Sequence, residues 1–230
     1  MTSEAIEIIP TCVPMDENGL KTSADAVRSF SKSIHIDIDD ELCAPVRTWP
    51  YTSPGVWGTF DLSGAKDLEA DIHLMVQEPR EIGIAFARAA AVRIMGHIEA
   101  FKNPDEARDA LDAWRASGAR EAGLAILKAT PFEAVEPALS VCDVVHMMTI
   151  ATIGTQGIPY QPDAPARIAE FHSRHPELLI SVDGGVSEQN ITELARAGAR
   201  RFGVGAAIAR ASNPADAYKR LRSLAEAARV

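Results

Sequence analysis

Short apolar runs alternate with amphipathic segments about eight times along the chain. The runs lie at roughly 6–10, 33–38, 71–76, 92–98, 122–127, 143–150, 178–183 and 200–204. Apolar residues recur at helical spacing at roughly 23–32, 79–90, 104–117, 132–140, 163–175, 187–198 and 213–228. Eight strand–helix units predict an α/β fold, a single eight-stranded parallel βα (TIM) barrel. An open doubly wound sheet would need a glycine-rich loop after its first strand, and Ile9–Pro14 contains no glycine.

One long stretch, at about 39–69, breaks this rhythm. It contains several prolines and glycines together with Trp49, Tyr51 and Trp57, so a regular helix is hard to place there. Two interpretations remain open: a lid or binding loop, or a surface excursion packed by its own aromatic residues. Because no linker or change of composition divides the chain, we expect residues 1–230 to form a single domain.

The composition excludes several classes of protein. With 230 residues, of which 47% are hydrophobic, the chain can bury a core of one domain. A formal charge of −9 argues against a nucleic-acid-binding protein, which needs a basic surface. The chain has no apolar run long enough to span a membrane and no secretory signal. Its three cysteines share no metal or redox spacing, so we expect a cytoplasmic protein with reduced thiols and no membrane partner.

Four residues with metal-binding side chains lie near the ends of three predicted strands. They are His35, Asp37, His73 and Asp183. Because side chains alternate between the faces of a strand, each of them lies opposite its apolar neighbours, and His35 and Asp37 share one face. The reactive residues of a βα barrel gather where its strands end. Two imidazoles and two carboxylates that meet there would suit a divalent ion.

These residues belong to motifs that occur in order along the chain. The sequence resembles the ribulose-phosphate 3-epimerase family over most of its length. The matching segments are 9–11, 35–38, 71–76, 96–100, 122–125, 130–131, 148–150 and 182–186. The most specific combination is His-x-Asp, then His-Leu-Met-Val, then Val-Asp-Gly-Gly.

The resemblance implies an isomerase that inverts the carbon next to the ketone of a ketose phosphate. Ribulose 5-phosphate, xylulose 5-phosphate or a related sugar phosphate would be the substrate. One divalent ion (zinc, manganese, iron or cobalt) would bind to His35, Asp37, His73 and Asp183. Asp37 and Asp183 would also exchange protons on opposite sides of an enediolate, which the cation would stabilise. Since members of the family form symmetric oligomers, the resemblance also implies a homo-oligomer.

Further residues are implied for substrate binding. Met75 and Met148 match methionines near the reacting carbon, although such residues also serve as core filler. Gly184-Gly185 would open a helix whose N-terminus favours a phosphate, with Gly205-Ala206 and Gly154 on the neighbouring loops. The substrate-facing residues depart from the family pattern: Ala206 replaces a serine, the loop at 151–157 matches only loosely, and Pro14 and Asp39 replace other residues. The sequence therefore predicts the reaction class more firmly than the substrate.

Two alternatives use the same scaffold. A metal-dependent sugar-phosphate aldolase would also need a metal-stabilised enolate, and a non-catalytic barrel could retain only sugar-phosphate binding. The lysine that barrel decarboxylases of this type carry has no counterpart in 37–40. His97 and Glu99 are expected to form a supporting polar layer inside the barrel, and His146 to be a hydrogen-bonded interior residue rather than a ligand.

Overall fold

The computed structural model describes residues 5–154 and 158–228, and its central element is a closed barrel of parallel strands. The strands follow one another around the barrel in the order β1, β10, β9, β8, β7, β6, β5, β2 and back to β1. They are β1 (Glu7–Cys12), β2 (Ser33–Asp39), β5 (Glu69–Met75), β6 (Arg93–His97), β7 (Glu121–Ile126), β8 (Val144–Met148), β9 (Leu179–Asp183) and β10 (Arg201–Val204). The prediction of an eight-stranded βα barrel is confirmed.

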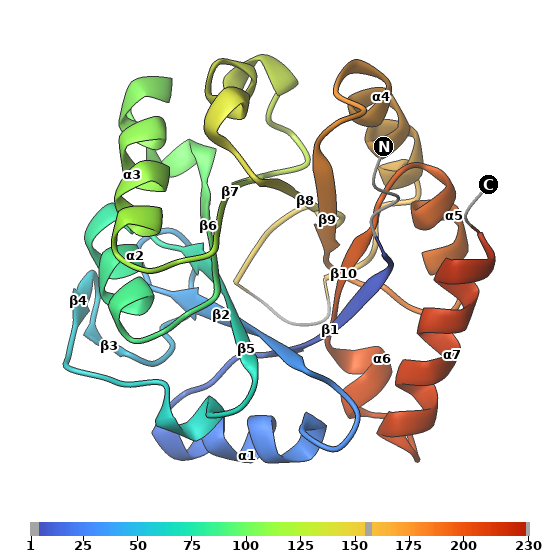
Figure 1. Ribbon diagram of the computed structural model, residues 1–230, viewed down its shortest axis with the longest axis horizontal. Helices are drawn as coiled ribbons and strands as arrows, with labels where there is room; N and C mark the ends of the chain where they lie inside the picture. Colours follow the sequence, from blue (N-terminus) through green and yellow to red (C-terminus); the bar gives the residue numbers. More distant parts are fainter. Residues whose placement is uncertain (1–4, 155–157, 229–230) are drawn as a thin grey trace.

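Helices surround the strands (Figure 1). They are α1 (Glu17–Val27), α2 (Pro79–Arg88), α3 (Pro104–Ala116), α4 (Ala164–Arg174), α5 (Ile191–Arg196), α6 (Ala206–Ala209) and α7 (Pro214–Ala227), with short 3-10 helices at Ser63–Ala65, Ile98–Ala100, Phe132–Ala134 and Glu136–Val141. On β2, Ile34, Ile36 and Ile38 are buried in the hydrophobic core. Their polar neighbours His35 and Asp37 therefore face the barrel interior, as strand alternation requires. Within the described residues, no helix is both long enough and apolar enough to cross a membrane.

Three helices differ from the sequence prediction. The first begins at Glu17 rather than near 23, because the Asp16 side chain accepts a hydrogen bond from Gly19 N at 2.7 Å and caps it. The segment at 132–140 forms two 3-10 helices, since Pro137 cannot supply the amide that an α-helix needs. α5 begins at Ile191, not near 187, because the Asn190 side chain bonds Ser187 N and Gly185 O and holds a turn there.

The excursion at 39–69 is packed by aromatic residues. It contains a small hairpin of β3 (Tyr51–Ser53) and β4 (Val56–Trp57). Trp49 and Phe60 pack against each other and against Phe86 of α2, with ring centroids between 4.4 and 5.9 Å apart. Near its start, however, Val46 lines the cavity of the barrel. The excursion is thus anchored to the outside of the barrel and also contributes to its mouth.

Charged residues fill the N-terminal end of the barrel. Arg93 and Arg201 are only 5% and 4% exposed, and they form ion pairs with Glu7, Glu69 and Glu121 at 2.9–3.4 Å. Buried guanidinium groups need such partners, so these pairs compensate the charges inside the barrel. The main cavity lies at the opposite end.

Candidate active site

A cavity of about 840 Å³ opens at the C-terminal ends of the strands. Its lining includes Asp37 of β2, Met75 of β5, Met148 of β8 and Asp183 of β9. This is the end of a βα barrel at which active sites are built. The two aspartates come from strands that are separated by β1 and β10, so the closed barrel is what brings them to one cavity.

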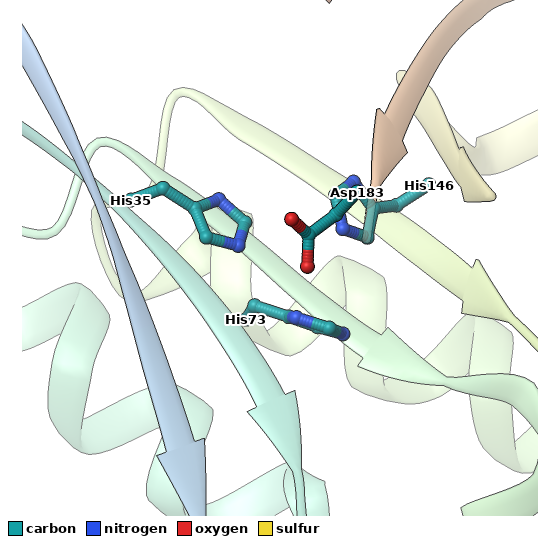
Figure 2. Close-up of side chains that lie close together, drawn as sticks. All are labelled: His35, His73, His146 and Asp183. Carbon is teal, nitrogen blue, oxygen red and sulfur yellow. The ribbon is translucent and has the colours of Figure 1, made fainter. Parts of the chain in front are cut away.

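The four residues that the sequence singled out as ligands lie close together. Asp37 Oδ1 is 3.1 Å from His73 Nδ1 and 3.3 Å from His35 Nε2. Asp183 offers a carboxylate oxygen to the same group as His35 and His73, with ligand atoms within 4.8 Å of one another. Figure 2 shows the Asp183 carboxylate pointing towards the space between the His35 and His73 rings.

This arrangement fits a divalent cation. His35 Nε2 is buried and has no aligned hydrogen-bond partner among the described residues, although Asp37 Oδ1 is near. Nitrogens of His35 and His73 and a carboxylate oxygen of Asp183 lie within 4.8 Å of one another. Asp37 is not part of that group, but its Oδ1 lies beside both imidazoles. Such a mixed donor set suits zinc, manganese, iron or cobalt. The second nitrogen of His35 lies 3.6 Å from Asp71 Oδ1, which is too far for a hydrogen bond but places a negative charge beside this ring.

Asp37 and Asp183, which both line the cavity, have opposite pKa shifts. Burial raises the pKa of Asp37, but hydrogen bonds and positive charge from His35 and His73 outweigh burial and hold the pKa below its usual range. Burial and the negative charge of Asp37 raise the pKa of Asp183, and the two histidines offset them only partly. An ionised carboxylate thus lies near a carboxyl that holds its proton more readily, which is the usual pattern of an acid–base pair.

His146 belongs to the same group of side chains, although the sequence predicted only a hydrogen-bonded interior histidine. Its Nδ1 lies 2.9 Å from Ser181 Oγ, as that prediction requires. Its Nε2, however, is buried without a hydrogen-bond partner among the described residues, and a nitrogen of its ring is within 4.8 Å of the ligand atoms of His35, His73 and Asp183. The sequence could have indicated this position of His146. It lies two residues before Met148 on β8, so both side chains point to the same face of the strand, and Met148 lines the cavity.

Asp39 also lines the cavity, and it is 1% exposed. Burial, with the negative charges of Asp37 and Asp40, raises the pKa of Asp39 to about 8. Its carboxyl group therefore holds a proton more readily than an ordinary aspartic acid does. Asp39 has the same parity on β2 as Asp37, and burial reduces the negative charge that its carboxyl group would add to the cavity.

The glycines expected to bind phosphate line the other side of the cavity. Gly184, Gly185 and Gly205 all contribute to its wall, together with Ala206. Gly184 and Gly185 have φ of +109° and +69°, and a Cβ at Gly184 would lie 2.8 Å from Ile150, so glycine is required there. The expectation that this pair opens a helix is wrong, because α5 begins only at Ile191.

The remaining loop residue from the sequence prediction is Gly154. It lines the cavity with φ of +77°, and a Cβ there would lie 2.1 Å from Ala44 Cβ. Residues 155–157 of the same loop lie outside the described residues. Met75, Met148 and Ile153 form a small apolar cluster with Ala44 beside these polar groups.

Sequence reasoning missed Arg210, which is the cation that lines the cavity among the described residues. It follows α6 and is exposed, and no ion pair or side-chain hydrogen bond engages it within the part of the chain that the structure describes. The carboxyl groups in the lining are Asp37, Asp39, Asp183 and Glu188. A cation just past the loop that carries Gly205 was the sequence signal that could have found it.

The sequence matches the model of the ribulose-phosphate 3 epimerase family over residues 7–209. The chain belongs to this family. Among its relatives, ribulose-phosphate 3-epimerase of Chlamydia muridarum is 30% identical over 209 residues, which cover 86% of each chain. The cytoplasmic isoform of the enzyme from Oryza sativa subsp. japonica is 28% identical, over 96% of this chain and 95% of its own.

Membership of the ribulose-phosphate 3-epimerase family confirms the prediction of an isomerase that acts on carbohydrates. It supports a sugar-phosphate substrate in general. The fold is shared more widely: 3-hexulose-6-phosphate synthase from Salmonella typhimurium is 12% identical, with a TM-score of 0.68 over 97% of this chain and 100% of its own.

Proposed function

We propose that this protein is a metal-dependent epimerase of a ketose phosphate, with ribulose 5-phosphate and xylulose 5-phosphate as its first candidate substrates. The observation that carries the proposal is that Asp37 and Asp183 reach one cavity beside two imidazoles. Inverting a carbon next to a ketone requires removing a proton from one face and returning a proton to the other. Two carboxyl groups with opposite pKa shifts are suited to that exchange.

In this proposal, His35, Asp37, His73 and Asp183 would hold one divalent ion. A bound cation supplies Lewis-acid stabilisation of the negative charge that develops on the substrate oxygens. Asp37 and Asp183 take and give the proton at the reacting carbon, and they exchange roles when the reaction runs in reverse. Met75 and Met148 provide an apolar wall that limits water at this carbon.

The phosphate group is proposed to bind on the side of Gly184, Gly185 and Gly205, away from Asp39. Glycine has no side chain that would shield its backbone amide from an anion. Ala206 also keeps its backbone amide, which can donate to a phosphate without help from a side chain. Arg210 adds a positive charge at the same wall. Since the other charged side chains in the lining are acidic, an anionic group is favoured only near Arg210.

A homo-oligomer in the cytoplasm is part of the same proposal. The location is supported by the similarity to a relative that is named a cytoplasmic isoform. The homo-oligomer is proposed from the family resemblance alone. Sedimentation of the purified protein would test the oligomeric state.

Incubation of the enzyme with ketose phosphates in D₂O is expected to place deuterium at C3. The reason is that a proton removed by one carboxyl group and returned by the other can exchange with solvent. Mass spectrometry and NMR would measure incorporation into ribulose 5-phosphate, hexulose phosphates and the unphosphorylated sugars side by side, with metal-loaded enzyme.

The products distinguish the alternatives. Epimerisation conserves the mass of the sugar apart from the deuterium, whereas an aldolase would release two fragments. Faster exchange into unphosphorylated sugars would refute the proposal that the substrate carries a phosphate group. No exchange into any ketose would refute the epimerase assignment.

Replacing Arg210 with alanine is expected to raise KM for the phosphorylated ketose by roughly 10- to 100-fold, because a charge-assisted hydrogen bond contributes about 1.5–3 kcal/mol. The KM of the unphosphorylated sugar and the metal content should hardly change. Steady-state kinetics on both sugars would measure this. Arg222→Ala is the matched control, since Arg222 lies on α7 and pairs with Glu226. Equal effects of Arg210→Ala on both sugars would contradict a phosphate contact.

A further inference from the structure

Behind the proposed metal site, a line of polar contacts runs from His73 to Glu99. His73 Nε2 is 2.9 Å from His97 Nε2, and His97 Nδ1 is 3.1 Å from Glu99 Oε2. His73 is fully buried and His97 is 1% exposed. The sequence predicted His97 and Glu99 as a supporting polar layer, and these contacts connect that layer directly to a proposed ligand.

The orientation of the Glu99 carboxylate is fixed by the loop that follows β7. Its Oε1 accepts a hydrogen bond from Leu127 N at 2.9 Å and another from Thr130 Oγ1. This leaves Oε2 for His97. Since a carboxylate can only accept, the His97 Nδ1 atom that faces it carries a proton.

The proton on His97 Nδ1 determines which of the other ring nitrogens of His97 and His73 carry protons. With Nδ1 protonated, a neutral His97 has its lone pair on Nε2, so His73 must donate from Nε2. A neutral His73 then has its own lone pair on Nδ1, which faces Asp37 Oδ1 at 3.1 Å. Two acceptor atoms this close need a positive charge between them, either a second proton on His73 or a metal cation that takes its place. The alternative, a charged His97 that donates to His73, would bury an extra charge and would leave a proton on His73 Nδ1.

We propose that Glu99, acting through His97, is a positioning residue that holds His73 as the Nε2–H tautomer and so leaves Nδ1 free to bind the divalent ion. This inference rests on the metal site of the proposed function. A hydrogen-bond partner on the second nitrogen of a ligating histidine is the usual way of setting its tautomer and orientation. Here that partner is a second histidine, which is itself set by the carboxylate.

The variant Glu99→Gln is expected to reverse the donor and acceptor roles in the hydrogen bonds from residue 99 through His97 to His73. The side chains themselves should keep their positions, because glutamine has nearly the shape of glutamate. The donors Leu127 N and Thr130 Oγ1 hold the amide oxygen at the position of Oε1, so the amide NH₂ group faces His97 Nδ1. His97 must then accept at Nδ1 and donate from Nε2. His73 in turn must accept at Nε2, and its proton moves to Nδ1, the atom that would bind the metal.

The experiment is a zinc titration of the full-length apoprotein and of Glu99→Gln, with a chromophoric competitor, together with ¹⁵N NMR of the histidine rings in the zinc-loaded proteins. Glu99→Gln is expected to bind zinc about 10- to 100-fold more weakly. In the wild type, the ring shifts should show His73 with zinc at Nδ1 and a proton at Nε2. A thermal melt would confirm that both proteins are folded.

Glu133→Gln is the matched control, because it makes the same carboxyl-to-amide change at an exposed residue that pairs with Arg174. Its zinc affinity should stay within a few-fold of wild type. Equal affinities for wild type and Glu99→Gln, or zinc at Nε2 of His73, would overturn the inference while leaving the epimerase proposal intact. A wild-type protein that binds no zinc, manganese, iron or cobalt would overturn both.

Discussion

Replacing Asp183 with asparagine is expected to lower kcat by more than the roughly 10²- to 10⁴-fold that follows from losing one proton-transfer group. An amide has nearly the shape of the carboxyl group but cannot take up or release the proton. The additional loss is expected because Asp183 is also a proposed ligand. Asp37→Asn should behave in the same way, since Asp37 lies between His35 and His73. Initial rates would be measured in both directions of the reaction.

Metal content must be measured on the same samples, so that loss of the ion is not mistaken for loss of the acid or base. Glu188→Gln is the matched carboxyl-to-amide control: Glu188 is at the rim of the cavity and pairs with Arg220 at 2.9 Å. Its kcat should stay within a few-fold of the wild-type value. A metal-replete Asp183→Asn enzyme with a near-normal rate would refute the proposed role.

Truncating His35 or His73 to alanine is expected to abolish stoichiometric binding of the divalent ion, and activity with it. Each change removes an imidazole from a donor set drawn from three strands, and the remaining side chains cannot close the gap because the barrel backbone is rigidly hydrogen-bonded. Elemental analysis of protein purified without chelator would measure the content. Chelation of the wild type should abolish activity, and a divalent ion should restore it.

His146→Leu separates the proposed ligand set from its neighbours. Leucine removes the imidazole next to His35, His73 and Asp183 but leaves the proposed ligands in place. The variant is expected to retain one ion per chain. If it loses the ion as completely as His73→Ala does, His146 is a ligand and the proposed set of ligands is wrong. Equal metal content in the wild type, His35→Ala and His73→Ala would refute the proposed metal site as a whole.

The barrel itself followed from the sequence because strand and helix periodicities are local. On β2, the alternation of isoleucine with His35 and Asp37 predicted which side chains face inward, and all of these residues are buried as expected. The helices predicted at roughly 104–117 and 213–228 begin within one residue of those positions, because Asn103 and Asn213 cap them through amides three residues away. The start of α5 was not predicted correctly, because there a side-chain turn competes with the helix.

The partners of the proposed site residues could not be predicted in the same way. His97 is 24 residues from His73, and Ser181 is 35 residues from His146, yet both pairs are in contact at 2.9 Å. Parity says which side of a strand a residue faces, but not how far along the barrel axis it lies relative to a residue on another strand. That requires the register between strands.

The sequence by itself therefore determined the repeating strand–helix pattern, the inward parity of the candidate ligands and the family. Only the tertiary structure decided that His146 joins them, that Glu99 is linked to His73 through His97, that burial raises the pKa of Asp39 and that Arg210 reaches the cavity. The physical reason is that the first group depends on the order of neighbouring residues. The second depends on closure of the barrel, which sets the register, excludes water from its interior and brings distant loops to one end.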